Sequence, residues 1–170
     1  MLGDGEESDL SIPDYQTLML PVLQLAAEGE TRVPHVAEKL ADALSLTEAE
    51  REELLPSGRQ RILHNRIHWA KFYMGKAGLL GSPTRGKFVA SEAGKALLST
   101  NPATLDVERL KTYPAFLEFY SKSGSNAGPE ETPAAKAAAT SEITPEEQID
   151  AAYGVLHSAL KADLLQRILA

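Results

Sequence analysis

The chain has no cysteine among its 170 residues, and this absence excludes two classes of site. Without thiols it can form neither a disulfide framework nor a zinc site with thiolate ligands. Aromatic residues are also scarce, at 6% of the chain, whereas the helix formers alanine, leucine, glutamate and lysine are abundant. This composition predicts a mainly α-helical protein that buries one ordinary hydrophobic core.

Long hydrophobic runs are absent as well. No apolar stretch is long enough to cross a bilayer, and the first nine residues are acidic rather than basic and apolar like a secretion signal. We therefore expect a cytoplasmic protein with no membrane partner. We also expect its first residues, 1–11, to be flexible.

Acidic residues are missing from one long window, the 38 residues from Leu54 to Ser91. The window carries seven cations, so its formal charge is +7, while the whole chain has −7 and the rest must therefore hold −14. Such asymmetry predicts a cationic surface on an acidic body, which is typical of proteins that bind a polyanion such as nucleic acid.

Hydrophobic periodicity and turn residues divide the chain into segments. A helix, a short extended piece, a second helix and a short helix after Thr47 precede a long basic helix at Arg59–Ala77. Two short strands around 83–86 and a helix beginning at Ser91 follow. This order predicts a winged helix-turn-helix with a β-hairpin wing. The predicted segments are a DNA-binding domain at 12–120, a flexible linker at 121–143 and a separate C-terminal helix at 144–170.

The long basic helix has two distinct faces. At 3.6 residues per turn, one sector is apolar and should contact the core; it consists of Leu63, Ile67, Ala70, Met74 and Ala77. The opposite sector is polar and lacks carboxylates; it gathers Arg61, His64, Asn65, His68, Lys71 and Phe72. In a DNA major groove, arginine can pair with guanine and asparagine with adenine, while lysine and histidine can meet phosphates.

Further cations flank this face. Arg59 precedes it, Arg66 lies beside it, and the wing carries Arg85 at its tip. A wing-tip arginine can enter a minor groove, where negative potential is concentrated. The candidate DNA-binding residues are Arg59, Arg61, His64, Asn65, Arg66, His68, Lys71, Lys76, Arg85 and Lys87.

The aromatic side chains on this helix could either pack within the protein or contact DNA bases. Phe72 either contacts a thymine methyl group or packs under the wing, and packing is the favoured alternative. Trp69, the single tryptophan, is expected to pack in or just below the surface rather than to stack on a base.

Catalytic and metal-binding patterns are weak. His64 and His68 have the spacing of a zinc pair, but Asn65 stands where metalloproteases have a glutamate, and no third ligand follows. The acid-free window also lacks the carboxylates that nucleases use to hold Mg²⁺. We expect no metal site and no catalytic residue in this chain.

Several strings resemble a known family. Residues Ile12 to about Ser121 resemble the N-terminal domain of Mrr restriction endonucleases, on the strings Pro13-Asp14-Tyr15, Leu20-Pro21-Val22-Leu23, 59–70 (RQRILHNRIHWA) and 76–80 (KAGLL). The strings 144–153 (TPEEQIDAAY) and 162–165 (ADLL) resemble the helix that leads into the family's nuclease domain. The resemblance implies double-stranded DNA as partner and type IV restriction, which is cleavage of modified, typically methylated, DNA.

The resemblance also implies what the chain would lack. In the family a C-terminal PD-(D/E)xK nuclease domain cuts with Mg²⁺, and its catalytic residues have no counterparts up to Ala170. We therefore expect a recognition module without its catalytic domain, so whether the chain alone is an enzyme stays open. Two alternatives also remain: a protein-interaction domain, with a homodimer through the apolar stripe of 144–170, and a winged-helix transcription regulator.

Overall fold

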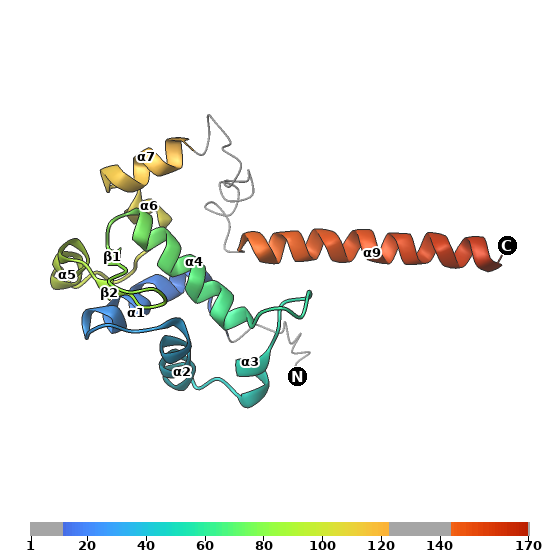
Figure 1. Ribbon diagram of the computed structural model, residues 1–170, viewed down its shortest axis with the longest axis horizontal. Coiled ribbons are helices and arrows are strands. Elements are labelled where there is room, and N and C mark those ends of the chain that lie inside the picture. Colours follow the sequence, from blue (N-terminus) through green and yellow to red (C-terminus); the bar gives the residue numbers. More distant parts are fainter. Residues whose placement is uncertain (1–11, 123–143, 170) are drawn as a thin grey trace, which may run out of the picture.

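The computed structural model describes residues 12–122 and 144–169, and it is mainly helical with one small sheet (Figure 1). The helices are α1 (Tyr15–Ala27), α2 (Val33–Ala43), α3 (Glu48–Glu52), α4 (Ile62–Lys76), α5 (Glu92–Ser99), α6 (Val107–Leu110), α7 (Pro114–Lys122) and α9 (Pro145–Leu169). The predicted flexible segments 1–11 and 123–143 lie outside the described residues, whereas Ser121 and Lys122 belong to α7 rather than to the predicted linker.

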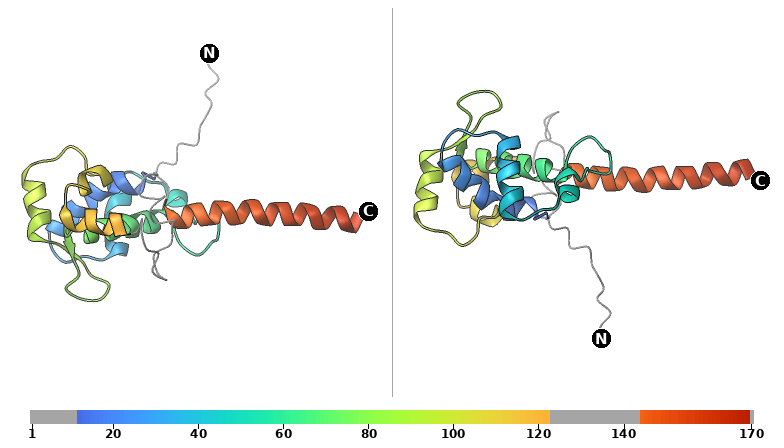
Figure 2. Two further views of the ribbon diagram at one scale, coloured as in Figure 1. Left: turned by 90° about the horizontal axis from the view of Figure 1, so that it is seen from above. Right: turned by 90° about the horizontal axis from the view of Figure 1, so that it is seen from below.

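The sheet is an antiparallel hairpin directly after α4. Its strands are β1 (Leu80–Gly81) and β2 (Val89–Ala90), with Leu80 opposite Ala90. Thr31, between α1 and α2, adds a bridge to Phe88 and so lengthens the sheet by one short piece. The turn needs a glycine at Gly86, where φ is +80°. The hairpin loop projects from the side of the body in both views of Figure 2.

The core forms where α4 packs across α1 and α2. Its largest fully buried side chains include Tyr15, Met19, Ile67, Met74 and Phe88. The five residues predicted for the apolar face of the basic helix are all buried, as their helical spacing required. The element order confirms the predicted fold class, a mainly helical body with a hairpin after the long helix, and is consistent with a winged helix.

Local sequence signals set the helix starts. Thr47 and Glu50 form a capping box at the start of α3, and the Ser91 hydroxyl accepts a hydrogen bond from the backbone N–H of Gly94 at the start of α5. Pro21 lies inside α1, where it removes one backbone donor, yet the helix continues to Ala27.

The basic helix begins three residues later than predicted, at Ile62 instead of Arg59. The backbone N–H of Leu55 donates to the Gln60 carbonyl at 2.8 Å, and a bridge joins Leu54 to Arg61. The segment before α4 is therefore a tight loop, turned at Gly58 with φ +71°. Arg59 consequently lies in a loop rather than on the helix.

The C-terminal helix α9 forms as the sequence predicted, and its start contacts the body. Thr144 caps it, because its hydroxyl accepts from the backbone N–H of Glu147 at 3.2 Å. Thr144 and Pro145 are buried against the body, whereas residues 151–169 are exposed and α9 extends away from it (Figure 1). Among the described residues no helix has the length and apolar character needed to cross a bilayer.

Candidate nucleic-acid interface

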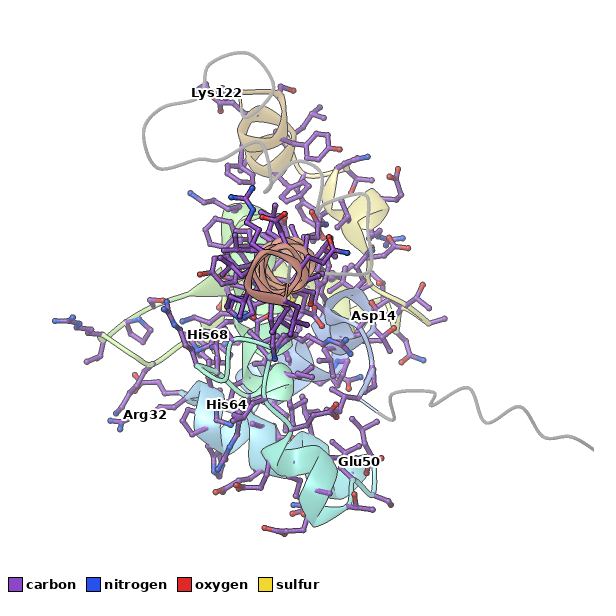
Figure 3. All side chains as sticks on the ribbon, turned by 90° about the vertical axis from the view of Figure 1, so that its right-hand side faces the viewer. Asp14, Arg32, Glu50, His64, His68 and Lys122 are labelled. Carbon is purple, nitrogen blue, oxygen red and sulfur yellow. The ribbon has the colours of Figure 1, made fainter. Side chains whose placement is uncertain are left out.

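A narrow polar stripe remains exposed along α4 and faces the wing side. His64, His68 and Lys71 are partly or fully exposed, one helical turn apart. Figure 3 shows His64 and His68 on the same side of the molecule as the hairpin and Arg32, with Asp14 on the opposite side. The Nζ atom of Lys71 lies 5.3 Å from the ring centre of Phe88, a residue of the hairpin. The stripe and the wing therefore border one surface.

Asn65 does not belong to this surface, contrary to the prediction that it could pair with a base. It is 1% exposed, and its Oδ1 accepts from the Thr144 hydroxyl at 2.6 Å. Its Nδ2 donates to the Gln60 side chain at 3.2 Å. The first turn of α9 covers it, so its amide joins three segments of the chain instead of reading DNA.

Arg66 was also predicted as a DNA contact, and it too is buried. Its guanidinium donates to Glu147 at 2.8 Å and to the carbonyl oxygen of Ile12 at 2.6 Å. A third hydrogen bond reaches the carbonyl of Pro13 at 3.2 Å. These partners consume the donors of Arg66, which therefore ties the chain entry and α9 to α4 and cannot reach a phosphate.

The cations before α4 differ from each other. Arg59 is exposed in the loop. Arg61 occupies the N-cap position of α4, and its guanidinium contacts Glu52 of α3 at 2.6 Å. Both side chains of this pair are about half exposed, so the contact is weak and the arginine can exchange partners with a phosphate.

Lys76 and Phe72 lie towards α7 rather than along the stripe. The Lys76 ammonium group is 5.3 Å from the ring centre of Phe72 and 4.9 Å from that of Phe119. Phe72 also makes edge contacts with Trp69 and Phe119, at 5.4 and 5.9 Å between ring centres. It packs as predicted, although mainly against this aromatic cluster and not simply under the wing.

The wing carries two of the predicted residues. Arg85 is exposed beside Gly86 at the turn. Lys87 is half exposed and lies 3.6 Å from Glu30, in the loop after α1. Arg85 is therefore the more accessible wing cation.

Carboxylates from other elements approach the cationic window, although the window itself has none. Glu30 and Glu52 pair with Lys87 and Arg61, as described, and Glu146 of α9 accepts a hydrogen bond from the Trp69 indole N–H. The tertiary structure thus lowers the charge density that the window alone would present.

The two histidines of the stripe have lowered pKa values. Burial is the main cause for both; Arg61 lowers the pKa of His64 further, and Lys71 that of His68. Glu38 and Glu146 act in the opposite direction, on His64 and His68 respectively. Neutral imidazoles result at neutral pH, each with one N–H donor and one nitrogen acceptor for hydrogen bonding.

An open hollow of about 420 Å³ lies next to the stripe. Trp69 and Phe72 form its apolar wall, and His68 and Lys71 line its edge towards the stripe. Glu146 of α9, Asn65 and Gln60 complete its lining. Trp69 is half-buried: its ring packs against Tyr73, 5.6 Å between centres, as predicted, and it also lines the hollow.

Sequence reasoning missed two residues at this surface. Arg32, at the N-cap position of α2, is exposed on the side of the wing (Figure 3). It lies outside the acid-free window, and a lone arginine before a Val-Pro helix start was the available signal. Glu146 had no signal, because only the docking of α9 brings it beside Trp69.

No group of three or more metal-binding side chains occurs within residues 12–122 and 144–169. His64 and His68 therefore lack a third ligand in this part of the chain, and their pair does not form a metal centre by itself.

Comparison with known proteins is consistent with this geometry. The family model described as Mrr N-terminal domain matches residues 15–100, which run from α1 through the hairpin to α5. The chain is also similar to the type IV methyl-directed restriction enzyme EcoKMrr of Escherichia coli K12, at 28% identity over 174 residues. That alignment covers 94% of this chain and 54% of the relative, so the chain spans about half the relative's length.

No solved structure matches the chain. The family match covers about half of the chain's residues. It includes α4, which carries the stripe, and the hairpin that forms the wing. By this match the chain belongs to the family of Mrr N-terminal domains.

Proposed function

We propose that this chain is the duplex-DNA-binding module of an Mrr-type restriction enzyme. The observation that carries the proposal is the surface shared by α4 and the hairpin. His64 and His68 lie on the side of the hairpin in Figure 3. Lys71 contacts Phe88 of the hairpin, and Arg85 is exposed at its turn. Each of these polar side chains can donate to phosphates or base edges. Winged-helix order supports the proposal, because a helix followed by a hairpin can place one element in a groove and the other on the adjacent backbone.

Each part of the surface has a distinct role in this proposal. The neutral imidazoles of His64 and His68 face the major groove, where one N–H and one nitrogen lone pair can contact base edges. Lys71, Arg59 and Arg32 bind phosphates beside the groove. Arg85 reaches the neighbouring backbone or minor groove from the wing.

The restriction activity would belong to the whole enzyme. The printed name of the relative describes a methyl-directed restriction enzyme, and the chain covers about half of it. We infer that this module selects DNA, including methylated DNA, for cleavage by a nuclease domain. That domain would use Mg²⁺, whereas the described residues contain no group of three or more side chains that could hold the ion.

A salt series of duplex-DNA binding tests this function. Four to six neutralised phosphates would give a slope of log K against log salt of about −4 to −5. The double variant Lys71→Ala/Arg85→Ala removes two of these contacts and should flatten the slope by about 2. Binding is measured by fluorescence anisotropy with a labelled duplex, methylated and unmethylated.

The matched control is Lys111→Ala/Lys122→Ala, which removes the same charge from α6 and α7. Both lysines pair with glutamates, and Lys122 lies well away from the hairpin in Figure 3. We expect this control to keep the slope of the unsubstituted protein. Equal losses in both double variants, or a slope near zero without substitution, would contradict the proposed interface.

A second candidate function is assembly through α9, which would make the chain an interaction domain. Residues 151–169 of this helix are exposed, and they include large apolar side chains that water disfavours: Tyr153, Val155, Leu156, Leu160, Leu164, Leu165, Ile168 and Leu169. A homodimer through this helix would cover part of that surface. A stable dimer that binds a palindromic duplex would instead favour a winged-helix transcription regulator.

A further inference from the structure

The hollow beside the stripe has a composition that the proposed groove contacts do not use. Its lining combines two aromatic side chains, the ammonium group of Lys71 and the carboxylate of Glu146. Its volume of about 420 Å³ is within the range of small-molecule pockets, which is about 300–1,000 Å³. It lies against the proposed DNA surface, because His68 and Lys71 belong to both.

The aromatic wall is held in place before any ligand arrives. The indole N–H of Trp69 donates to Glu146, and its ring tilts against the buried Tyr73. Phe72 meets Trp69 nearly at a right angle, 73° between ring planes, and remains 40% exposed. An exposed, fixed aromatic surface of this kind is suited to stacking on a planar base.

Glu146 provides the polar recognition element. A carboxylate has about four lone-pair sites on its two oxygens, so the bond to Trp69 leaves acceptor capacity. An exocyclic amine donates hydrogen bonds and fits this acceptor, whereas a carbonyl oxygen at the same position would be repelled. The hollow therefore favours a base with such an amine, as cytosine, adenine and guanine have, over thymine.

We propose that this hollow takes a single base with an exocyclic amine displaced from the duplex, and cytosine and adenine are the two such bases used to test it. The base stacks on one of the two aromatic rings and meets the other at its edge, its amine donates to Glu146, and Lys71 binds the adjacent phosphate. A methyl group on the base would add apolar contact with the aromatic wall. This inference rests on the proposed DNA-binding function and locates base recognition where α9 meets α4.

The intrinsic fluorescence of Trp69 reports on the hollow directly, because the chain has no other tryptophan. The full chain is titrated with three duplexes: one fully paired, one with a cytosine opposite an abasic site, and one with 5-methylcytosine there. A parallel set carries adenine, N6-methyladenine or thymine opposite the abasic site. An unpaired base costs little to displace, so this arrangement supplies the base without the unpairing penalty.

We expect displaced cytosine or adenine to change Trp69 fluorescence and to bind at least about 30-fold tighter than the paired duplex, since the unpairing cost is removed. One buried methyl group should add about a further fourfold. Displaced thymine should show neither effect. A preference for only one of the two methylated bases would identify which base the hollow accepts.

Two variants with equal charge change separate recognition from electrostatics. Glu146→Ala removes the proposed acceptor, and Asp150→Ala removes a carboxylate one turn further along α9, where it accepts from the Ser57 backbone. Both should strengthen binding of the paired duplex similarly, by reducing repulsion. Only Glu146→Ala should lose the preference for a displaced cytosine or adenine over thymine.

The outcomes distinguish this inference from the function on which it rests. Salt-sensitive binding without any preference for a displaced base would overturn the base site and leave the DNA-binding function intact. A change in Trp69 fluorescence that is as large with the paired duplex would also overturn it, because it indicates groove contact. Failure of every duplex to bind at low salt would overturn both.

Discussion

Arg66 and Glu147 form a buried ion pair, 2.8 Å apart, although 81 residues separate them in the chain. Their side chains are 9% and 13% exposed. Since Arg66 also binds two backbone carbonyls near Ile12, this one guanidinium links the start of the described chain, α4 and α9. The cation that the sequence assigned to DNA is therefore the main polar link within the fold.

Arg66→Ala should destabilise the protein strongly. It leaves the Glu147 carboxylate partly buried without its partner, a change that costs about 3–5 kcal/mol in buried pairs. Urea unfolding followed by circular dichroism measures the loss. The control is Arg167→Ala, whose partner Asp163 lies with it on the exposed surface of α9; it should cost about 0–1 kcal/mol. Similar losses in the free energy of unfolding of the two variants would show that the buried pair stabilises the protein no more than the exposed pair does.

Two glycine substitutions should have opposite effects on stability. A Cβ at Gly94 would lie 2.3 Å from the carbonyl oxygen of Leu79, so Gly94→Ala forces α5 away from the segment before β1. We expect a loss of about 1–3 kcal/mol, the usual range for overpacking. Gly75 lies in α4 with nothing within 4 Å of its Cβ position, so Gly75→Ala should add roughly 0.5–1 kcal/mol. Thermal unfolding of both variants tests this, and we expect a lower midpoint for Gly94→Ala and a higher one for Gly75→Ala.

DNA affinity should increase as the pH falls, through His64 and His68. Burial lowers their pKa values in the free protein, whereas phosphates nearby would raise these values in the complex. The bound state then takes up protons, so the gain is complete below the free-state pKa and is lost as the pH rises through the bound-state pKa. A shift of one unit per histidine corresponds to about tenfold in affinity.

Anisotropy titrations between pH 5 and 8 at fixed salt test this linkage. The double variant His64→Gln/His68→Gln should flatten the profile. His157→Gln, on the exposed part of α9, should leave it unchanged. A profile that persists in the double variant would assign the protons to other groups.

Self-association through α9 should depend on its leucines. Leu164→Asp adds one negative charge on the exposed apolar surface, where Leu164 is 50% exposed. Gln166→Asp adds the same charge at a polar position of the helix. If α9 pairs with its copy, light scattering should show a concentration-dependent dimer that Leu164→Asp weakens and Gln166→Asp retains. A monomer at all concentrations would contradict the homodimer.

Much of the fold was predictable because its determinants are local. Apolar spacing identifies the core face of α4, and short-range signals at Thr47, Ser91 and Thr144 identify three helix starts. The predicted helix start at Arg59 was wrong for a reason that is also local: backbone hydrogen bonds of the loop around Gly58 form instead of a first helical turn. The predicted DNA residues Lys71, Arg85 and His68 remain on the candidate surface for the same reason, since they lie opposite the apolar spacing or in the turn.

The sequence by itself therefore determined the order of elements, the apolar side of each helix and the location of excess positive charge. Only the tertiary structure decided which polar residues of α4 stay exposed. Asn65 and Arg66 look like surface residues on a helical projection, but the first turn of α9 covers them. Helical spacing describes one element and its nearest neighbours, whereas burial depends on a segment about 80 residues away, which no local pattern in α4 can reveal.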